Sequence, residues 1–570
     1  MAASLLIAAA VSPPAAGASR IFDWNGSDGA AQSQATQRFG KMFPNLPPFQ
    51  FSAQAAADLV AAMEDKSTDP VGVDEGTAED NPNLPAEYTY LGQFLDHDLD
   101  FDTTPQPSAP VNPNTLVNHE SFLWDLSDVF GGGPSADPQL YAADHRHLLI
   151  QGTVQTPNPN GQTVVKNGNP NGVLDLPRAA NGSAIIADPR DDENQILSQI
   201  DTAFITFYND FVNRGMSYAQ ARELTENYYQ EIVLTDVLPH YVGQATIDRY
   251  LRTRQVFGHT VYSLNTPNYP VGDYTPIEFS VGAYRFGHAL VRQVYHINDI
   301  LPDTTDIDDN VTIFDLNTFQ RGDLTGGGQL PGPIPSSTAC GITQPVATQA
   351  LCGLNNPAGH QITWRYFVPA LSAEQAADGL PIDMASTGCT GATSGPGSPG
   401  TRGCGDKGIN FARKTQTSIV PALFNLPASA IAGCNDAASP VCNGSGNLMS
   451  RDFARGEEYG LPSGQSIARA MGCQVIPAAS INPTHDSVFD KGTPLLYYVL
   501  AEAQRAHRTL GCVGAGIVTQ IFLRVLWNTP NSILRRPFTP SPSLVKIDPH
   551  KKLFSFGDLL VDTHIAPRLS

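Results

Sequence analysis

The sequence predicts a mainly α-helical protein with a large single core, little β structure and long loop insertions. Apolar residues recur at three- and four-residue spacing through the strongest segments, which is the period of helices with one buried face. No alternation of strands and helices indicates a parallel sheet, and no repeat of fixed length is visible. The chain has 570 residues, 41% of them hydrophobic, which is enough to bury a sizeable core. The predicted helices cover residues 53–63, 88–98, 195–214, 218–237, 277–294, 466–471, 495–510 and 514–527.

Turn-rich segments separate these helices. Gly, Pro, Asn and Ser dominate residues 157–172 and the stretches around 322–360, 378–408 and 430–446, which predicts surface loop insertions. Six of the eight cysteines lie in the last three stretches as sequential pairs, at positions 340, 352, 389, 404, 434 and 442. Neighbour pairing would close three local loops, but it is one of roughly a hundred connectivities, so the pairing stays open. Cys473 and Cys512 lie in helical patterns and are either buried thiols or a fourth bridge.

Charge and hydropathy exclude several partners. With 55 acidic and 34 basic residues the net charge is -21, which repels nucleic acid and anionic membranes. The most apolar stretch, residues 513–527, is too short to span a bilayer, so no membrane span is expected. Residues 1–19 resemble a signal peptide but lack its basic n-region, so cleavage stays open. Together with the cysteines, this segment favours a secreted or periplasmic protein.

The segment from Tyr90 to Asp100 places a histidine between two aspartates. In a helix, Gln93 and His97 share a face at i,i+4, while Asp96 and Asp98 project about 100° to either side of the histidine. One short helix then offers a proton acceptor and two differently aimed carboxylates. Solvated charges at a helix end explain the triplet equally well, so its meaning depends on the rest of the chain.

A second candidate stands directly before the helix predicted to begin near residue 195. Proline and acidic residues at a helix start are ordinary capping chemistry, which explains Asp191 and Asp192. Capping does not explain Arg190, because a guanidinium at a helix N-terminus opposes the macrodipole. Glu193 lies three residues further and can face the same side as Arg190.

A third candidate is Tyr284-Arg-Phe-Gly-His288, inside the apolar segment 277–294. Gly287 removes a side chain where something must approach the helix closely, and Arg285 lies one turn from His288. A lone histidine here would more often be a hydrogen-bonded core residue. The histidine with an arginine and a gap instead favours a ligand for a large planar group that carries anionic substituents.

Together the three motifs resemble those of the animal-type haem peroxidases, in the peroxidase-cyclooxygenase superfamily, and most closely its bacterial members. The resemblance spans roughly residues 40–560. It implies a haem peroxidase domain over residues 20–570, with the cysteine-bearing stretches as insertions. Further matching segments are residues 125–131, 424–427, 451–456, 460–464 and 493–502.

The resemblance implies that His97 is the catalytic distal histidine and His288 the iron ligand of haem b. His97 would take a proton from hydrogen peroxide and return it to the departing oxygen, while Arg190 supplies fixed positive charge. Gln93 would order distal water or a halide. The implied activity is oxidation of ferric haem by hydrogen peroxide to an oxoferryl species, which then oxidises a small anionic or aromatic donor: a halide, thiocyanate or a phenol.

Carboxylates near the haem carry further implied roles. Asp96 and Glu193 match the two residues that form ester bonds to haem methyl groups; the alternative is that they are simply acidic residues near the pocket. Asn194 stands where the mammalian granulocyte enzyme has a methionine, which argues against efficient chloride oxidation. The resemblance also implies a calcium site of oxygen ligands, with an ordinary polar turn as the alternative. Its ligands would be Asp98, Ser121, the Leu123 carbonyl, Asp125 and Ser127.

On the proximal side, Asp452 stands where the family has an asparagine that hydrogen-bonds the iron-ligating histidine. A carboxylate there would give the imidazole more anionic character and lower the reduction potential of the iron. Arg285 and Arg455 fit contacts with the haem propionates, because arginine binds carboxylates in a bidentate manner.

Two other functions remain as alternatives. A haem-dependent fatty-acid dioxygenase of the same superfamily would need a tyrosine three residues before the proximal histidine, where this chain has Arg285; Tyr284 lies one residue too early. A non-catalytic calcium-binding or adhesive protein on the same scaffold would not need His97, Arg190 and His288 together. The electron donor, the covalent state of the haem and the oligomeric state stay open.

Overall fold

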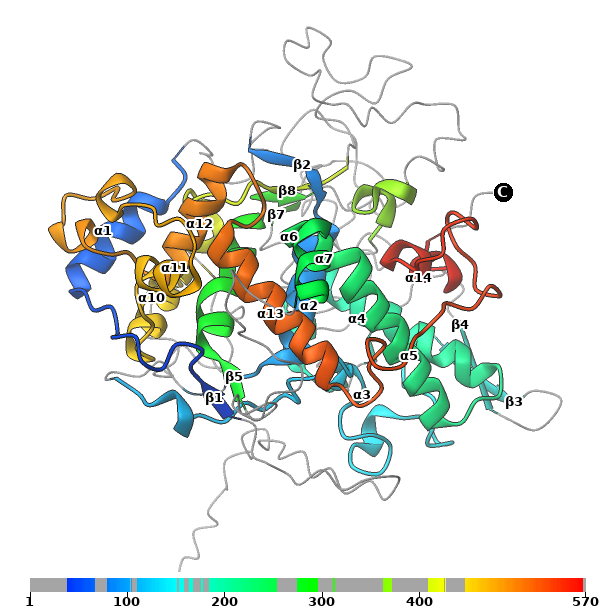
Figure 1. Cartoon of the computed structure of the whole chain (residues 1–570). Coiled ribbons are helices and arrows are strands. Elements are labelled where there is room, and N and C mark those ends of the chain that lie inside the picture. Colours follow the sequence, from blue (N-terminus) through cyan, green and yellow to red (C-terminus); the bar gives the residue numbers. More distant parts are fainter. Residues whose placement is uncertain are drawn as a thin grey trace, which may run out of the picture.

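The computed structural model confirms the mainly α-helical class with little β structure (Figure 1). It describes residues 38–66, 79–102, 104, 110–150, 153–157, 163–167, 176–177, 184–253, 274–295, 311–312, 362–371, 409–424, 426 and 446–566. Residues 1–19 and the predicted cysteine-bearing insertions lie outside this part of the chain, apart from Gly446.

The strongly periodic segments form helices close to their predicted bounds. Side-chain caps explain several starts: Ser52, Asn194 and Ser217 each accept a hydrogen bond from a backbone N–H in the first turn. These helices are α1 (Ala53–Met63), α2 (Glu87–Leu99), α4 (Gln195–Asn213), α5 (Tyr218–Ile232), α11 (Gly464–Met471), α12 (Leu495–Ala506) and α13 (Cys512–Asn528).

The predicted helix 277–294 differs from expectation in its winding. Residues Glu278–Gly282 form a π-helix, η5, and Ala283–Leu290 form a 3₁₀-helix, η6, so the segment is not a single α-helix and ends before Val294. A π-helix, η4 (Val233–Val237), likewise ends the predicted helix 218–237. Apolar spacing reports that a face is buried but does not distinguish these windings.

Several shorter helices were not predicted. In α10 (Leu448–Glu458) the buried face consists of Met449, Asp452, Phe453 and Gly456, and a buried aspartate breaks the apolar pattern. The others are α3 (Ser127–Phe130), α6 (Leu238–Val242), α7 (Gln244–Thr253) and α14 (Phe556–Asp562). Short 3₁₀ turns are η1 (Pro113–Thr115), η2 (Pro138–Leu140), η3 (Pro189–Asp192), η11 (Trp364–Tyr366), η14 (Pro421–Phe424), η16 (Ala478–Ser480) and η17 (Ser487–Asp490).

The described strands form two-stranded sheets only. β1 (Arg38–Gly40) pairs in parallel with β5 (Tyr274–Pro276). The antiparallel pairs are β2 (Asp80–Pro85) with β8 (Phe411–Arg413), β3 (Thr153–Pro157) with β4 (Thr163–Asn167), and β6 (Val294–Tyr295) with β7 (Val311–Thr312). The prediction of an irregular loop over 157–172 is therefore wrong for 163–167, where Thr-Val-Val-Lys-Asn includes β-branched residues that favour strands.

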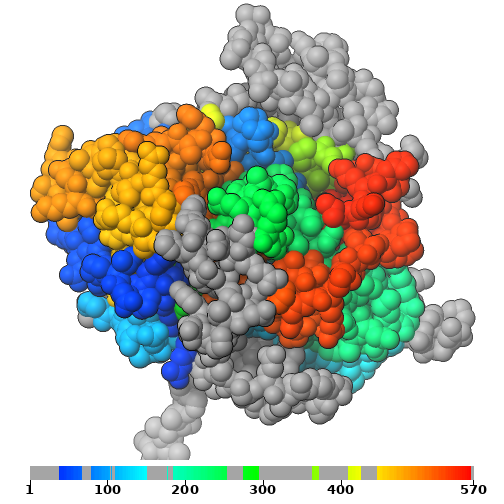
Figure 2. All heavy atoms as spheres, viewed as in Figure 1, coloured from blue at the N-terminus to red at the C-terminus, as the bar shows by residue number. Residues whose placement is uncertain are grey.

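The core surrounds α2, near the middle of Figure 1. This helix packs against α4, η3 and η6, and α13 packs against η5 and η6. Phe94 of α2 stacks on Phe204 of α4 with ring centroids 5.2 Å apart. Figure 2 shows segments distant in sequence side by side: blue N-terminal residues beside the yellow and orange helices, and the red C-terminal segment beside green α4 and α5. None of the described helices is long and apolar enough to cross a membrane.

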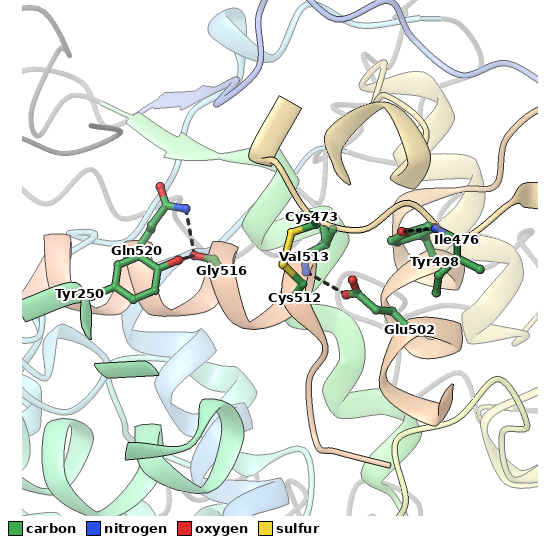
Figure 3. Close-up of a disulfide and its surroundings, with 9 residues drawn as sticks. All are labelled: Tyr250, Cys473, Ile476, Tyr498, Glu502, Cys512, Val513, Gly516 and Gln520. Atoms are coloured by element: carbon green, nitrogen blue, oxygen red, sulfur yellow. Dashed lines mark hydrogen bonds between the residues drawn. A yellow bond between two sulfur atoms is a disulfide. The ribbon is translucent and has the colours of Figure 1, made fainter. Parts of the chain in front are cut away.

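A disulfide joins Cys473, just after α11, to Cys512 at the start of α13 (Figure 3). The alternative of two buried thiols is thus excluded, while the pairing of the other six cysteines lies outside the described residues. The bridge closes a sequence separation of 39 residues around α12.

Replacing both Cys473 and Cys512 by serine is expected to lower the free energy of unfolding by about 3 to 4 kcal/mol, because the bridge restricts the unfolded chain. Denaturant titration of the double variant and the unreduced parent measures the difference. An unchanged unfolding midpoint and slope would show that the bridge contributes no stability.

Glu502 of α12 accepts a hydrogen bond from the Val513 backbone N–H at 2.8 Å, at the start of α13 (Figure 3). Burial raises the pKa of Glu502 to about 7 from 4.5, although N–H groups of Val513, Gly514 and Cys512 oppose the shift. The folded protein therefore holds a proton that the unfolded chain releases between pH 4.5 and 7, so this carboxyl makes folding less favourable as pH rises through that window.

As pH rises from 4.5 to 8, Glu502→Gln is therefore expected to gain about 3 kcal/mol of stability relative to the parent. Denaturant titrations of both proteins across this range test the difference, and Glu223→Gln at a half-exposed position is the control. A stability difference that does not vary with pH would contradict the buried-proton account.

Candidate active site

Helix α2 presents the first part of the candidate site. His97 is 5% exposed, and its Nδ1 lies 2.8 Å from Oδ1 of Asp191, which is fully buried. Asp191 belongs to η3, whose N-terminal cap is Asp188: its carboxylate accepts the Arg190 N–H at 2.8 Å. Asp191 and Asp192 do stand in the first turn of a helix, as predicted, but the Asp191 side chain has the additional contact with His97. Nothing in the sequence marks this contact, because its partners are 94 residues apart.

Arg190 lies beside the same histidine. Its guanidinium pairs with Asp188 at 2.5 Å, donates to the His97 carbonyl at 3.1 Å and lies over the Phe101 ring at 4.2 Å. Although burial opposes the charge, Asp188 raises the pKa of Arg190, which stays cationic. Burial lowers the pKa of His97 to about 3, and Arg190 adds to this shift. A neutral imidazole and a fixed positive charge thus stand side by side.

Gln93, Glu193 and Asn194 form one hydrogen-bonded group next to these residues. The Gln93 amide donates to Glu193 Oε2 at 3.1 Å, and its oxygen accepts from Asn194 Nδ2 at 3.1 Å. Burial raises the pKa of Glu193 to about 7, while Arg190 opposes the shift. The structure therefore places Glu193 on the side of α2 that carries Gln93.

The proximal group comes from η6 and α10. In a 3₁₀-helix, residues i and i+3 eclipse, which places Arg285 and His288 on one side. Both reach Asp452: Arg285 Nη1 donates to Oδ1 at 2.8 Å, and His288 Nδ1 lies 2.8 Å from Oδ2. Burial opposes ionisation, but His288 and Arg285 hold the pKa of Asp452 below its ordinary value. Since Nδ1 is engaged, Nε2 is the nitrogen of His288 that can ligate a metal.

Asp96 of α2 is influenced by charges from both groups of residues described above, those of η3 and those of η6. Its Oδ1 is buried without a hydrogen-bond partner among the described residues. Burial raises the pKa of Asp96, whereas the charges of Arg285, Arg190 and His288 lower it. One carboxylate thus lies within the electrostatic field of both the α2–η3 group and the η6–α10 group. The residues predicted to face each other across a haem are brought close together.

The contact between η6 and α2 is direct. The Tyr284 hydroxyl donates to the Gly92 carbonyl at 3.1 Å. Apart from the local backbone and the neighbouring residues, no atom of the described residues lies within 4 Å of the position that a Cβ on Gly287 would take. The side chains of Arg285 and His288 are 26% and 27% exposed, against 1% for Asp452, so they border open space.

Arg455 of α10 is engaged elsewhere. It pairs with Asp102 at 2.7 Å and donates to the Thr104 carbonyl at 3.0 Å. Tyr459 also donates to the Asp102 carboxylate. A propionate contact of Arg455 would have to exchange with or add to these partners, and it stays a prediction.

The loop predicted to bind calcium is internally hydrogen-bonded. Asp98 accepts the Ser127 N–H at 2.8 Å, and the Ser121 hydroxyl donates to Asp125 at 2.7 Å and accepts the Leu123 N–H at 3.2 Å. Glu120, which the sequence did not point to, accepts from the Ser127 hydroxyl at 2.7 Å. In the part of the chain that the structure describes, no group of three or more His, Cys, Asp or Glu side chains is arranged to hold a metal ion.

Comparisons with known proteins agree with this geometry. Residues 49–325 match the family model described as animal haem peroxidase, while a search of curated proteins gives no match. Peroxidase A from Dictyostelium discoideum is similar in structure at 14% identity and a TM-score of 0.49, with 93% of each chain covered. A fatty acid alpha-dioxygenase from Arabidopsis thaliana is similar at 14% identity and a TM-score of 0.51, covering 87% of this chain and 73% of that one.

At such identities the structural likeness concerns the fold alone, and a special closeness to bacterial members stays a prediction. The family model matches the segment that holds His97, Arg190 and His288. Residues 49–325 are thus identified as an animal haem peroxidase domain.

Proposed function

We propose that the protein is a haem peroxidase that uses hydrogen peroxide to oxidise a small anionic or aromatic donor. Bromide, iodide, thiocyanate and phenols are the expected donors. The contacts of α2 carry the proposal: its His97 carbonyl accepts from Arg190, and its Gly92 carbonyl accepts from Tyr284 of η6, the helix that bears Arg285 and His288. A neutral base, a fixed cation and a histidine with a free Nε2 thus lie around one site.

The residues present fit a haem. His288 offers Nε2, and the half-buried guanidinium of Arg285 suits a propionate. The unpartnered Oδ1 of Asp96 and the carboxyl of Glu193 are available for ester bonds. Bound haem would supply the redox chemistry of the reaction.

The side chains of this protein would manage protons and charge. His97 is neutral at any pH well above 3, so it can accept a proton from hydrogen peroxide and later return it. Arg190, fixed by Asp188, stabilises negative charge that develops as the peroxide bond breaks. Gln93 is held by Glu193 and Asn194 and can orient a water or halide.

The arrangement of Tyr284 favours a peroxidase over a fatty-acid dioxygenase. Its hydroxyl is tied to the Gly92 carbonyl, and Arg285 occupies the position three residues before His288. Hydrogen abstraction from a fatty acid would need a tyrosine facing the substrate. Guaiacol or bromide oxidation, compared with oxygen uptake in the presence of a long-chain fatty acid, separates the two activities.

The absorbance spectrum of the purified protein is the first test. A Soret band with peroxide-dependent oxidation of guaiacol is expected, whereas a protein that binds no haem would contradict both enzymatic functions and favour a non-catalytic role. Acid-acetone extraction followed by mass spectrometry tests the esters, with Asp96→Asn and Glu193→Gln as variants. Fully extractable, unmodified haem would exclude covalent attachment.

We further propose that the loop around Asp98 binds calcium through Asp98, Ser121, the Leu123 carbonyl, Asp125 and Ser127. Their oxygens are suited to a hard cation, and Asp98 adjoins His97. Removing calcium with a chelator is expected to lower the thermal midpoint and the peroxidase rate together, and added calcium should restore both. A midpoint that does not respond to chelation would count against the site.

Export to an oxidising compartment is also proposed. The Cys473–Cys512 bridge supports it, because disulfides persist in secreted and periplasmic proteins. Fractionation of cells that produce the protein tests this location.

A further inference from the structure

We propose that Asp191 is a positioning residue that holds the imidazole of His97 with its proton on Nδ1 and leaves Nε2 free to accept a proton. The inference rests on the proposed function, since it explains how the base of that reaction is kept ready. It concerns a side chain whose sequence context suggested only a helix cap.

Two consecutive residues of η3 bond His97 at two different atoms. The Arg190 guanidinium donates to the His97 carbonyl at 3.1 Å, and the Asp191 carboxylate lies 2.8 Å from Nδ1 of His97. Asp188 fixes the start of η3 through its side chain, and its carbonyl accepts the Asp191 N–H at 3.1 Å. A short turn tied down at both ends therefore fixes the place and rotation of the ring.

Tautomer chemistry gives the contact its function. A neutral imidazole carries one N–H, so Nε2 can act as a base only when the proton is on Nδ1. An ionised carboxylate is an acceptor only, so Asp191 in that form selects this tautomer. The aspartate of Ser-His-Asp hydrolases orients its histidine through the same kind of contact.

The surroundings of Asp191 define the competing arrangement. Burial and the carboxylates of Asp188 and Asp201 raise the pKa of Asp191, while Arg190 opposes them. A more basic carboxylate is a stronger acceptor for the Nδ1 proton. A protonated Asp191 would instead donate to Nδ1, and the remaining imidazole proton would sit on Nε2. The two arrangements differ in which ring nitrogen carries hydrogen.

Nitrogen NMR of the full-length chain labelled with [¹⁵N]histidine distinguishes them. If the protein carries haem, the diamagnetic ferrous carbon monoxide form is used; otherwise the chain is measured as purified. His97 resonances are assigned by their loss in His97→Gln. The expected result is hydrogen on Nδ1 in the parent and a shift toward Nε2–H in Asp191→Ala. Hydrogen on Nε2 in the parent would overturn the proposal.

Asp201→Asn is the matched control. Asp201 is fully buried, and neither of its carboxylate oxygens has a hydrogen-bond partner among the described residues. It influences the pKa of Asp191 but is not the partner of His97. The His97 tautomer should therefore be unchanged in Asp201→Asn. If this variant altered the tautomer as much as Asp191→Ala does, general loss of buried charge would replace the specific contact as the cause.

Cyanide binding to the ferric protein supplies a second readout. Hydrogen cyanide must lose its proton as it binds, and a free Nε2 would accept it. Asp191→Ala is expected to lower the association rate constant about 100-fold. Asp191→Asn keeps an amide oxygen as acceptor and should recover to within about tenfold of the parent. A parental rate constant in Asp191→Ala overturns the inference, whatever its stability.

The NMR and cyanide measurements test the role of Asp191 separately from the proposed peroxidase function. Absence of a Soret band would defeat the proposed function, yet the NMR tautomer would still decide the role of Asp191. A Soret band together with parental cyanide kinetics in Asp191→Ala would leave the peroxidase proposal standing and reject this inference. Should Asp191→Ala fail to fold by circular dichroism, the parent tautomer and Asp191→Asn supply the decision.

Discussion

Replacing His97 by alanine is expected to slow the reaction with hydrogen peroxide by about 10²- to 10⁴-fold, the usual contribution of a positioned acid–base group. The imidazole is neutral because burial lowers its pKa to about 3, so the parent has a base available across the physiological range. Alanine removes the proton acceptor while leaving the His288–Asp452 contact in place. Stopped-flow mixing with peroxide, followed in the Soret region, measures the rate constant.

The control for this prediction is His240→Ala. His240 lies at the end of α6 and stacks on Tyr88, away from the proposed chemistry. It should retain the parental rate constant with peroxide. A His97→Ala protein that binds haem and reacts at the parental rate would remove this residue from the mechanism and with it the argument for Asp191.

Replacing Asp452 by asparagine is expected to raise the Fe(III)/Fe(II) reduction potential by about 60 mV, equivalent to a tenfold change in a one-electron equilibrium. In the parent, the carboxylate bonds Nδ1 of His288 at 2.8 Å, which would increase the electron donation of the imidazole to a bound haem iron. An amide keeps a hydrogen bond but loses the negative charge. Spectroelectrochemical titration measures the potential.

Arg285→Gln provides a control of opposite sign. It removes the cation that shares the Asp452 carboxylate and leaves the histidine contact in place. The carboxylate should then donate more strongly, and the potential should fall. If Asp452→Asn left the potential unchanged, the proposed electronic role of this carboxylate would be wrong.

The sequence predicted the fold well where packing alone determines structure. Helices such as α4 and α13 are buried on nearly all sides and are rich in apolar residues, so their helical pattern is visible without knowledge of their neighbours. By contrast, α10 buries Asp452 among apolar residues, and its carboxylate is satisfied by Arg285 and His288 of η6. A pattern read along one segment cannot include partners supplied by another.

The same distinction applies to the candidate site: local motifs indicated some of its residues, whereas other contacts depend on how separate elements pack. Local motifs pointed to His97, Arg190, Arg285 and His288, and the structure packs the helices η3 and η6, which bear the last three, against α2, which bears His97. The contact of His97 with Asp191 depends on how η3 docks against α2, which no spacing reveals. The functions of the Asp98 loop and of Arg455 also depend on a bound ion or cofactor, so neither the sequence nor the protein fold alone determines them.

The 3₁₀ winding of η6 determines which substitutions in this helix keep the relative orientation of Arg285 and His288. An α-helix advances about 100° per residue, so it would turn His288 about 60° away from Arg285 instead of aligning the two. The 2.8 Å contacts of Arg285 and His288 with the Asp452 carboxylate would then have to readjust. Substitutions that favour α-helical winding, such as alanine at Gly287, would therefore trade helix stability against ligand orientation. A variant that stabilises this segment as an α-helix should therefore rotate His288 relative to Arg285.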